Sequence, residues 1–292
     1  MTTFLRIIYQ FNLLIKLSRL NNPVGIFLLF FPCCFGIGLV SLEQVKYNSL
    51  VILFLGSILM RSFGCIVNDI VDKDIDCRVA RTKLRPLANN QITVTNAIIY
   101  LMVISMVALM LLMQLSNLAI FLAILASTLI FIYPFMKRIT YYPQVVLGII
   151  FNSGALISYA NVTNNLTIAS VVMYIGCIFW TIGYDTIYAF ADAADDEKIK
   201  VKSLALVLKN NKYKLWILAS LYLTFISMFV ESILLSAFKL SIFAVLFIVA
   251  ATALLMWQIV TLDVTQPLNC LTRFKANTIV GLLLFIAMIL LQ

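Results

Sequence analysis

The feature that most constrains this chain is a series of apolar stretches, each long enough to cross a lipid bilayer. A transmembrane helix needs about 20 predominantly apolar residues, within a range of roughly 17–25. Such stretches follow one another along the whole sequence, and charged residues make up only 11% of it. A soluble domain usually carries about 25% charged residues. The exterior is therefore predicted to face lipid, and the fold class to be all-α, because a spanning helix satisfies its own backbone hydrogen bonds.

Nine such stretches are expected to span the membrane. They cover residues 24–42, 49–68, 94–114, 117–136, 144–161, 167–191, 213–231, 240–262 and 276–291. Residues 1–292 are interpreted as a single transmembrane domain, with residues 1–22 as an amphipathic N-terminal arm on the membrane surface. This arm contains Arg6, Lys16 and Arg19 and no acid. A short mitochondrial presequence is the alternative interpretation of the arm.

The positions of the basic residues support this count of spans. If the N-terminus is placed inside, nearly all of the 21 Lys and Arg residues lie in inner segments. Cytoplasmic loops of membrane proteins carry such an excess, and one missed span would destroy the alternation. We therefore expect the N-terminus on the cytoplasmic side and the C-terminus outside. The net charge of +9 is accounted for in this way and does not indicate nucleic-acid binding.

The acidic residues gather in two clusters on the predicted inner side. The first is NDIVDKDID, residues 68–76, and the second is YDTIYAFADAADDE, residues 184–197. Carboxylates beside membrane spans are costly unless something neutralises them, so they mark functional sites by default. Both clusters contain the spacing DxxxD, which places two carboxylates on one face of a helix. The alternative is that these acids are solvated helix ends beside basic loops. That interpretation could account for one cluster, but it does not account well for two clusters with the same spacing.

Both clusters offer only oxygen ligands, and the chain has no histidine. This inventory excludes His-ligated zinc and His-based triads, and it suits Mg²⁺, which prefers carboxylates and phosphate oxygens. We expect Mg²⁺ ions to bridge the two clusters to a diphosphate. The candidate metal ligands are Asn68, Asp69, Asp72, Asp76, Asp185, Asp192 and Asp196, and Asp72, Asp76, Asp192 and Asp196 are also the candidate catalytic residues. Basic residues after each cluster could bind the remaining phosphate oxygens: Arg78, Arg81, Lys83, Arg85, Lys198 and Lys202.

The motifs NDxxDxxxD with RTxxRPL, and YDTxYAxxDxxDD leading to KS, resemble those of the UbiA superfamily of intramembrane prenyltransferases. The stretch YPFMKRITYYPQVVLG, residues 133–148, is most similar to the 4-hydroxybenzoate polyprenyltransferase branch of ubiquinone synthesis. Two positions depart from the family pattern. Lys200 stands where glycine is usual, and Ala193–Ala194 replace more polar residues.

This resemblance implies nine transmembrane helices around a central cavity, which both aspartate motifs close on the cytoplasmic side. It also implies the substrates, polyprenyl diphosphate and 4-hydroxybenzoate, and Mg²⁺ as the cofactor. The prenyl group would join the ring ortho to its hydroxyl, with release of pyrophosphate.

Arg61 is a cation inside an apolar span, seven residues before Asn68 and so on about the same helical face. We expect it to hold the carboxylate of the aromatic acid; the alternative is that it extends to the inner membrane surface. Further candidates for this acid-binding pocket are Tyr133, Lys137, Arg138 and Asn152.

Three other functions are considered. The same chemistry could act on another aromatic or quinone-precursor acceptor. A secondary transporter would place its coupling carboxylates near the middle of the membrane, often on broken helices. A CDP-alcohol phosphotransferase would carry its aspartate motif once. The expected location is the bacterial inner membrane, with the mitochondrial inner membrane as the alternative.

Overall fold

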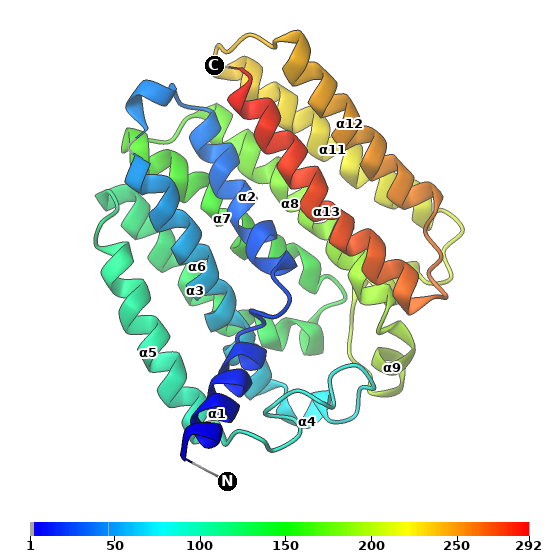
Figure 1. Cartoon of the computed structure of the whole chain (residues 1–292). Helices are drawn as coiled ribbons and strands as arrows, with labels where there is room; N and C mark the ends of the chain where they lie inside the picture. The colour runs from blue at the N-terminus through cyan, green and yellow to red at the C-terminus, as the bar shows by residue number, and fades with distance from the viewer. Residues whose placement is uncertain (1–2, 46, 292) are drawn as a thin grey trace.

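The fold is helical throughout the part of the chain that the computed structural model describes, residues 3–45 and 47–291 (Figure 1), which confirms the all-α prediction. Within these residues, eight helices are long and apolar enough to cross a membrane. They are α3 (Tyr47–Val71), α5 (Val94–Leu112), α6 (Asn117–Ile139), α7 (Pro143–Thr163), α8 (Ile168–Phe190), α11 (Lys214–Leu235), α12 (Ile242–Val260) and α13 (Pro267–Ile289). The first expected span is α2 (Val24–Gly38), which is apolar but has only 15 residues.

The ends of the bundle agree with an odd number of passes. The helix α1 (Thr3–Leu17) lies at the end that also holds α4 (Lys73–Asp76) and α9 (Ala193–Lys198), whereas α13 finishes at the opposite end (Figure 1). Since α2 runs between these two ends, it accounts for the ninth pass. The short helix α10 (Leu204–Leu208) and the 3₁₀ turn η1 (Leu42–Gln44) lie in connections.

The last helix begins nine residues earlier than residue 276, where its span was expected. Pro267 occupies the first turn of α13, where its fixed φ and missing N–H suit a helix start. Arg273, which we expected in the preceding loop, is therefore helical, and its guanidinium stacks on the Trp257 ring at 4.9 Å.

Local sequence fixes where several of the spans begin. Thr93, Ser116, Thr167 and Ser241 precede α5, α6, α8 and α12, and each side chain accepts a hydrogen bond from a backbone N–H in the first turn. Such caps satisfy donors that a helix start leaves without partners. Each of these Ser or Thr residues is therefore the N-cap at which a connection ends and the next span begins.

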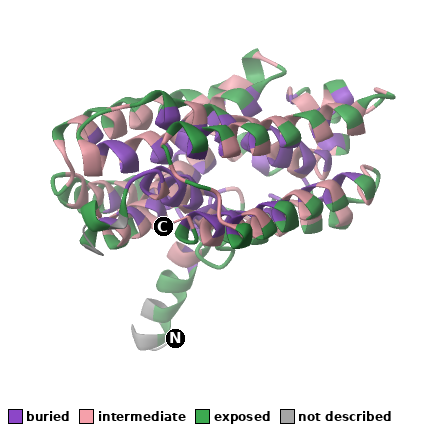
Figure 2. Cartoon of the chain, turned by 90° about the horizontal axis from the view of Figure 1, so that it is seen from above, coloured by how far each residue is buried: buried purple, intermediate pink, exposed green. Residues whose placement is uncertain are grey.

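The helix α8 lies at the centre of the packing, against α7, α11 and α13. Its Trp180 ring stacks on Phe225 of α11 with centroids 5.0 Å apart. The helices α2 and α7 approach closely because small residues meet there: a Cβ on Gly36 would lie 2.1 Å from the Ala155 carbonyl oxygen. Small residues at helix interfaces allow this approach in membranes. The buried residues consequently follow the inner faces of the helices (Figure 2).

The N-terminal helix α1 projects from the bundle (Figure 2). Its C-terminal end is anchored, since Leu13 and Leu17 are buried beside α3 and α5, whereas Phe11 is 63% exposed. The arrangement of the arm on a membrane surface stays a prediction.

Candidate active site

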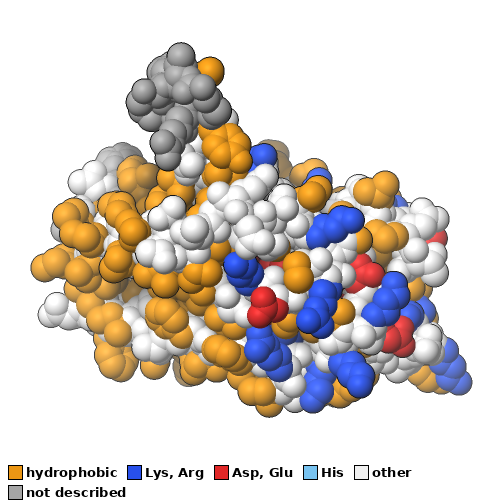
Figure 3. Space-filling view, turned by 90° about the horizontal axis from the view of Figure 1, so that it is seen from below, with side chains coloured by type: hydrophobic (Ala, Val, Ile, Leu, Met, Phe, Trp, Pro, Cys, Tyr) orange, Lys and Arg blue, Asp and Glu red, His pale blue; other side chains and the backbone are white. Residues whose placement is uncertain are grey.

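A cavity of about 730 Å³ opens among α2, α3, α6, α7 and α8. Its walls are apolar over most of their length, and polar side chains concentrate at the end near α4 and α9. The corresponding face of the molecule carries many of the charged side chains, next to a broad apolar surface (Figure 3). A concave, mostly apolar site of this volume with a few converging polar groups is typical of a small-molecule binding site.

The two aspartate motifs share one local conformation. The span α3 ends at Val71 and α4 begins at Lys73, so Asp72 lies at a helix break with φ −97° and ψ 7°. In the second motif, Asp192 lies at the break between α8 and α9, with φ −106° and ψ −2°. The continuous helical stripe that we expected from the spacing is therefore interrupted at the first aspartate of each DxxxD.

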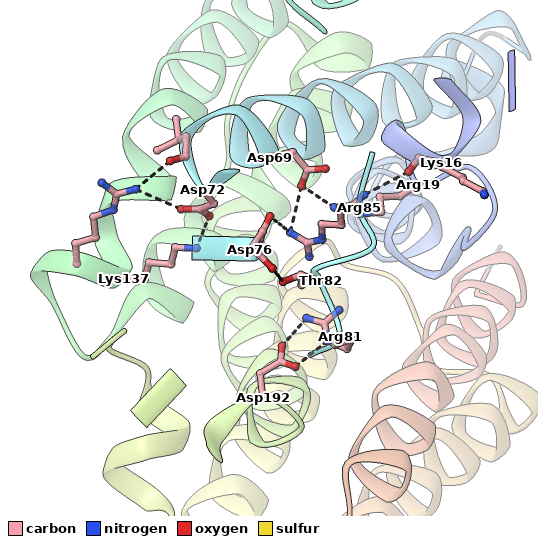
Figure 4. A network of polar contacts seen from close by, with 12 residues as sticks. Lys16, Arg19, Asp69, Asp72, Asp76, Arg81, Thr82, Arg85, Lys137 and Asp192 are labelled. Carbon is pink, nitrogen blue, oxygen red and sulfur yellow. Dashed lines mark hydrogen bonds and ion pairs between the residues drawn. The ribbon is translucent and has the colours of Figure 1, made fainter. Parts of the chain in front are cut away.

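Ion pairs surround the first motif (Figure 4). Arg85 Nη1 donates to Asp76 Oδ2 at 2.6 Å and to Asp69 Oδ1 at 3.2 Å. Arg19 Nη2 donates to the same Asp69 oxygen at 2.6 Å. Both aspartates are buried and line the cavity, and Asp69 Oδ2 has no hydrogen-bond partner. One oxygen of this cavity-lining carboxylate thus has no partner within the protein, and a cation could supply one.

Asp72 points to a different neighbour. Its carboxylate is buried and pairs with Lys137 Nζ, and Arg138 Nη2 lies 3.6 Å from Oδ1. Burial raises the pKa of Asp72, and the charge of Lys137 acts against this rise. Among these three residues, Lys137 lines the cavity, and Asp72 and Arg138 do not. The contact joins the end of α3 to the end of α6, and a role of Asp72 as a metal ligand stays a proposal.

The second motif is joined to the first by Arg81. Its Nε donates to Asp192 Oδ1 at 2.8 Å, its Nη2 pairs with the other oxygen, and its guanidinium stacks on Tyr188 at 4.9 Å. Asp196 lines the same part of the cavity, and burial together with the charge of Asp192 raises the pKa of Asp196 to about 7. A raised pKa of this kind means that nearby cations do not fully balance the negative charge of the carboxylate.

The other basic candidates differ in position. Lys202 lines the cavity and donates from Nζ to the Ile139 carbonyl oxygen at 3.0 Å. Arg78, Lys83 and Lys198 are exposed and do not line the cavity. Lys200 adopts φ 57°, the left-handed conformation that glycine enters without strain. This explains why glycine would suit that position.

The candidate acid-binding residues separate into two groups. Arg61, Tyr133 and Lys137 line the cavity, and Arg138 does not. The buried Asn152 amide, also outside the lining, donates to the Gly148 carbonyl oxygen and to Thr181 Oγ1, both at 2.7 Å. The guanidinium of Arg61 lies 5.5 Å from the Phe151 ring centroid, and its Nε is buried without a hydrogen-bond partner.

Glycine makes the position of Arg61 possible. A Cβ at Gly25 would lie 2.4 Å from Arg61 Nε, so a larger residue there would displace the guanidinium. The side chain therefore lies inside the bundle against α2.

Sequence reasoning did not assign Arg19 and Tyr188 to the site. Arg19 precedes the first span and adopts φ 58°, and this turn carries its side chain to Asp69. Its position at the entry of a span was the available signal. Tyr188 lines the cavity beneath Arg81, and its place in the second motif between Asp185 and Asp192 was the corresponding signal.

The donor set fits Mg²⁺. In the described part of the chain, no three His, Cys, Asp or Glu residues converge on a single point. Asp69, Asp76, Asp192, Asp196 and Asn68 nevertheless all line one cavity, with a buried free oxygen on Asp69. Mg²⁺ is usually held by one or two carboxylates, with substrate phosphates and water completing its octahedron. The residues present can therefore bind Mg²⁺ together with a diphosphate.

The model of the UbiA prenyltransferase family matches residues 29–289, which include both aspartate motifs. The chain belongs to this family. It is 38% identical to the 4-hydroxybenzoate polyprenyltransferase, mitochondrial, of Drosophila melanogaster, over 94% of this chain and 70% of the relative. It is 32% identical to the 4-hydroxybenzoate octaprenyltransferase of Coxiella burnetii, over 94% of this chain and 95% of the relative.

Solved structures show the same fold. A UbiA homolog from Aeropyrum pernix K1 matches with a TM-score of 0.76 at 20% identity, over 91% of this chain and 97% of that one. A UbiA homolog from Archaeoglobus fulgidus, bound to GPP and Mg²⁺, matches with a TM-score of 0.68 at 16% identity, over 96% and 99%. This multi-pass membrane protein is thus a prenyltransferase with the nine-pass UbiA architecture.

Proposed function

We propose that this prenyltransferase transfers a polyprenyl group from polyprenyl diphosphate to the ring of 4-hydroxybenzoate, ortho to the hydroxyl, and releases pyrophosphate. The observation that carries this proposal is the meeting of two aspartate motifs and their arginines at one end of an apolar cavity. Relatives from an animal mitochondrion and a bacterium are named for the same acceptor. The reaction would supply ubiquinone biosynthesis.

In this proposal, Mg²⁺ supplies positive charge that neutralises the departing pyrophosphate. The oxygen-bearing side chains would hold the cation: the carboxylates of Asp69, Asp76, Asp192, Asp196 and Asp185 and the amide oxygen of Asn68 from the cavity wall, with Asp72 at the helix break. Arg81 and Arg85, which pair with these aspartates, turn to the phosphate oxygens when the diphosphate enters. Lys202 is a further donor to the phosphates.

The transfer itself needs an electron-rich ring and an environment without water. The allylic C–O bond breaks and its electron pair leaves with pyrophosphate. The ring carbon ortho to the hydroxyl then bonds to the prenyl carbon, and loss of its proton restores aromaticity. The apolar wall, including Phe131, Phe151 and Ile150, keeps water from the carbocation.

The acid end of the acceptor is assigned to Arg61. A buried guanidinium without a hydrogen-bond partner on Nε is costly in a membrane, and a carboxylate matches its donor geometry. Tyr133 lines the same cavity, whereas Lys137 and Arg138 are already paired with Asp72.

Replacing Arg61 by Met should raise the KM for 4-hydroxybenzoate by about 30-fold or more, because an ion pair in a buried site is lost. The KM for polyprenyl diphosphate should change little, and Arg61→Lys should fall between. Steady-state kinetics with each substrate varied in turn measures both constants. Arg78→Met is the matched control, since Arg78 is exposed and does not line the cavity. If Arg61→Met weakened only the use of prenyl diphosphate, the arginine would belong to the pyrophosphate site.

The proposed function is tested by incubating membranes containing the protein with labelled 4-hydroxybenzoate and a series of prenyl diphosphates. Mass analysis should find 3-polyprenyl-4-hydroxybenzoate, and the preferred chain length would be read from the same products. Transfer to another phenol, with none to 4-hydroxybenzoate, would identify a different acceptor within the same chemistry.

The site favours the enzyme over a transporter. Asp72 and Asp192 lie at the ends of α3 and α8, where the spans finish, and not at breaks in the middle of a span. We place the protein in an energy-coupling membrane, the bacterial inner membrane or its mitochondrial counterpart, with the aspartate motifs on the side of the N-terminal arm.

A further inference from the structure

A chain of buried hydrogen bonds links α7 to the cavity through α8, and the acidic motifs take no part in it. Asn152 Nδ2 donates to Thr181 Oγ1 at 2.7 Å, and Thr181 Oγ1 donates to Tyr184 Oη at 2.9 Å. Asn152 and Thr181 are fully buried and do not line the cavity, whereas Tyr184 does. The chain therefore ends on the one member that can contact a substrate.

The orientation of the Asn152 amide is determined by its contact with Gly148. The same Nδ2 donates to the Gly148 carbonyl oxygen at 2.7 Å, and turning the amide would set its oxygen against that carbonyl. The amide nitrogen must therefore face both acceptors, and its two hydrogens are used. Thr181 Oγ1 accepts one of them and donates its own hydrogen to Tyr184 Oη. Because Tyr184 Oη accepts this bond, its own O–H remains free to donate.

The surroundings of Tyr184 hold its ring in place at the wall of a cavity that both Arg61 and Asp185 also line. Its ring is held edge-on to Trp180 at 5.5 Å and to Phe274 at 5.9 Å, so the hydroxyl cannot move far. Arg61 lines the same cavity as Tyr184, and its Nε is buried without a hydrogen-bond partner. The guanidinium of Arg61 and the hydroxyl of Tyr184 belong to residues that line the same cavity, and together they could meet the two oxygens of a carboxylate.

We propose that Tyr184 is a specificity-determining residue that donates a hydrogen bond to the carboxylate of the aromatic acceptor beside Arg61. Asn152 and Thr181 are positioning residues, because they orient the Tyr184 hydroxyl without touching the substrate. This inference rests on the proposed function and extends its acid-binding site. It also gives Asn152 an indirect role in place of the direct contact expected from the sequence.

The test compares Tyr184→Phe with Tyr174→Phe in the full-length protein. Tyr174 is on the same helix, donates to the Ile149 carbonyl oxygen at 3.0 Å and does not line the cavity. Tyr184→Phe should raise both the KM and the Kd for 4-hydroxybenzoate about 10- to 100-fold, the usual effect of losing a hydrogen bond to a charged group. The KM for prenyl diphosphate should stay constant. Tyr174→Phe should change none of these constants.

The neutral analogue 4-hydroxybenzamide identifies the group that Tyr184 contacts. The wild-type protein should bind the acid more tightly than the amide in calorimetric titrations, and Tyr184→Phe should reduce this preference. Equal weakening of acid and amide would overturn the proposal, because the hydroxyl would then serve another part of the ring.

The positioning roles are tested by a double-mutant cycle. Thr181→Val should raise the KM for the acid a few-fold in the wild-type background and add nothing in Tyr184→Phe, whereas Thr181→Ser should restore the wild-type value. Equal effects of Thr181→Val in both backgrounds would overturn the relay.

Failure of the proposed function would look different. In that case 4-hydroxybenzoate would bind with the expected dependence on Tyr184 but would not be prenylated. Absence of both binding and turnover would remove the carboxylate site together with the function.

Discussion

Asp76→Asn is expected to lower the rate of prenyl transfer by a factor of about 100 to 1,000, the usual effect of removing one electrostatic contact to the reacting groups. Asp76 is buried, lines the cavity and lies on the short helix α4, which follows the span α3. Asparagine keeps the shape and one oxygen of the side chain but loses the charge that holds a cation. Arg85 keeps Asp69 as a partner at 3.2 Å, so the fold should remain.

A matched control lies two residues away. Asp74 is on the same short helix but is exposed and does not line the cavity, so Asp74→Asn should keep near-normal activity. Asp192→Asn should repeat the loss from the second motif. The measurement is the single-turnover rate in purified protein, with melting temperatures to confirm folding. Near-normal activity of Asp76→Asn would remove this residue from the catalytic site.

Chelation should have the largest effect of all, a loss of activity by a factor of about 1,000 or more, since a metal ion contributes several kcal/mol to leaving-group stabilisation. The ligands around the cavity are all oxygen atoms, one of them a free buried oxygen of Asp69. Added Mg²⁺ in excess over EDTA should restore the rate, which shows that chelation did not denature the protein. Turnover at the full rate, with residual metal measured well below the protein concentration, would contradict the mechanism.

The chain itself carried much of the information about topology. Hydropathy and the alternation of basic loops predicted the helical fold and the passes, because length, apolarity and charge bias are local properties of each segment. The main errors were at the ends. Val24–Gly38 is shorter than its expected span, and α13 starts at Pro267 because proline suits a helix start. The repeated DxxxD and the arginine-rich segment between the motifs likewise identified the family from sequence.

The partner of each charged side chain was decided by the tertiary structure alone. Periodicity placed Asp72 and Asp76 on one stripe, but the helix breaks at Asp72, whose carboxylate turns to Lys137 on α6. Arg81 reaches Asp192, 111 residues later in the chain. These pairs depend on which helix ends meet at the membrane surface, and helix packing determines that meeting.

Helix packing also decided the positions of the residues predicted to bind the carboxylate of the acceptor. The sequence alone determined that Arg61 is a cation within an apolar span and that oxygen-rich motifs lie at the inner ends of two spans. Only the structure turned Asn152 toward Thr181 and buried Arg61 Nε without a hydrogen-bond partner against Gly25, which makes room for it. Sequence patterns report the environment along one helix. The direction of a side chain depends on the neighbouring helix, because a buried polar group must find its partner there.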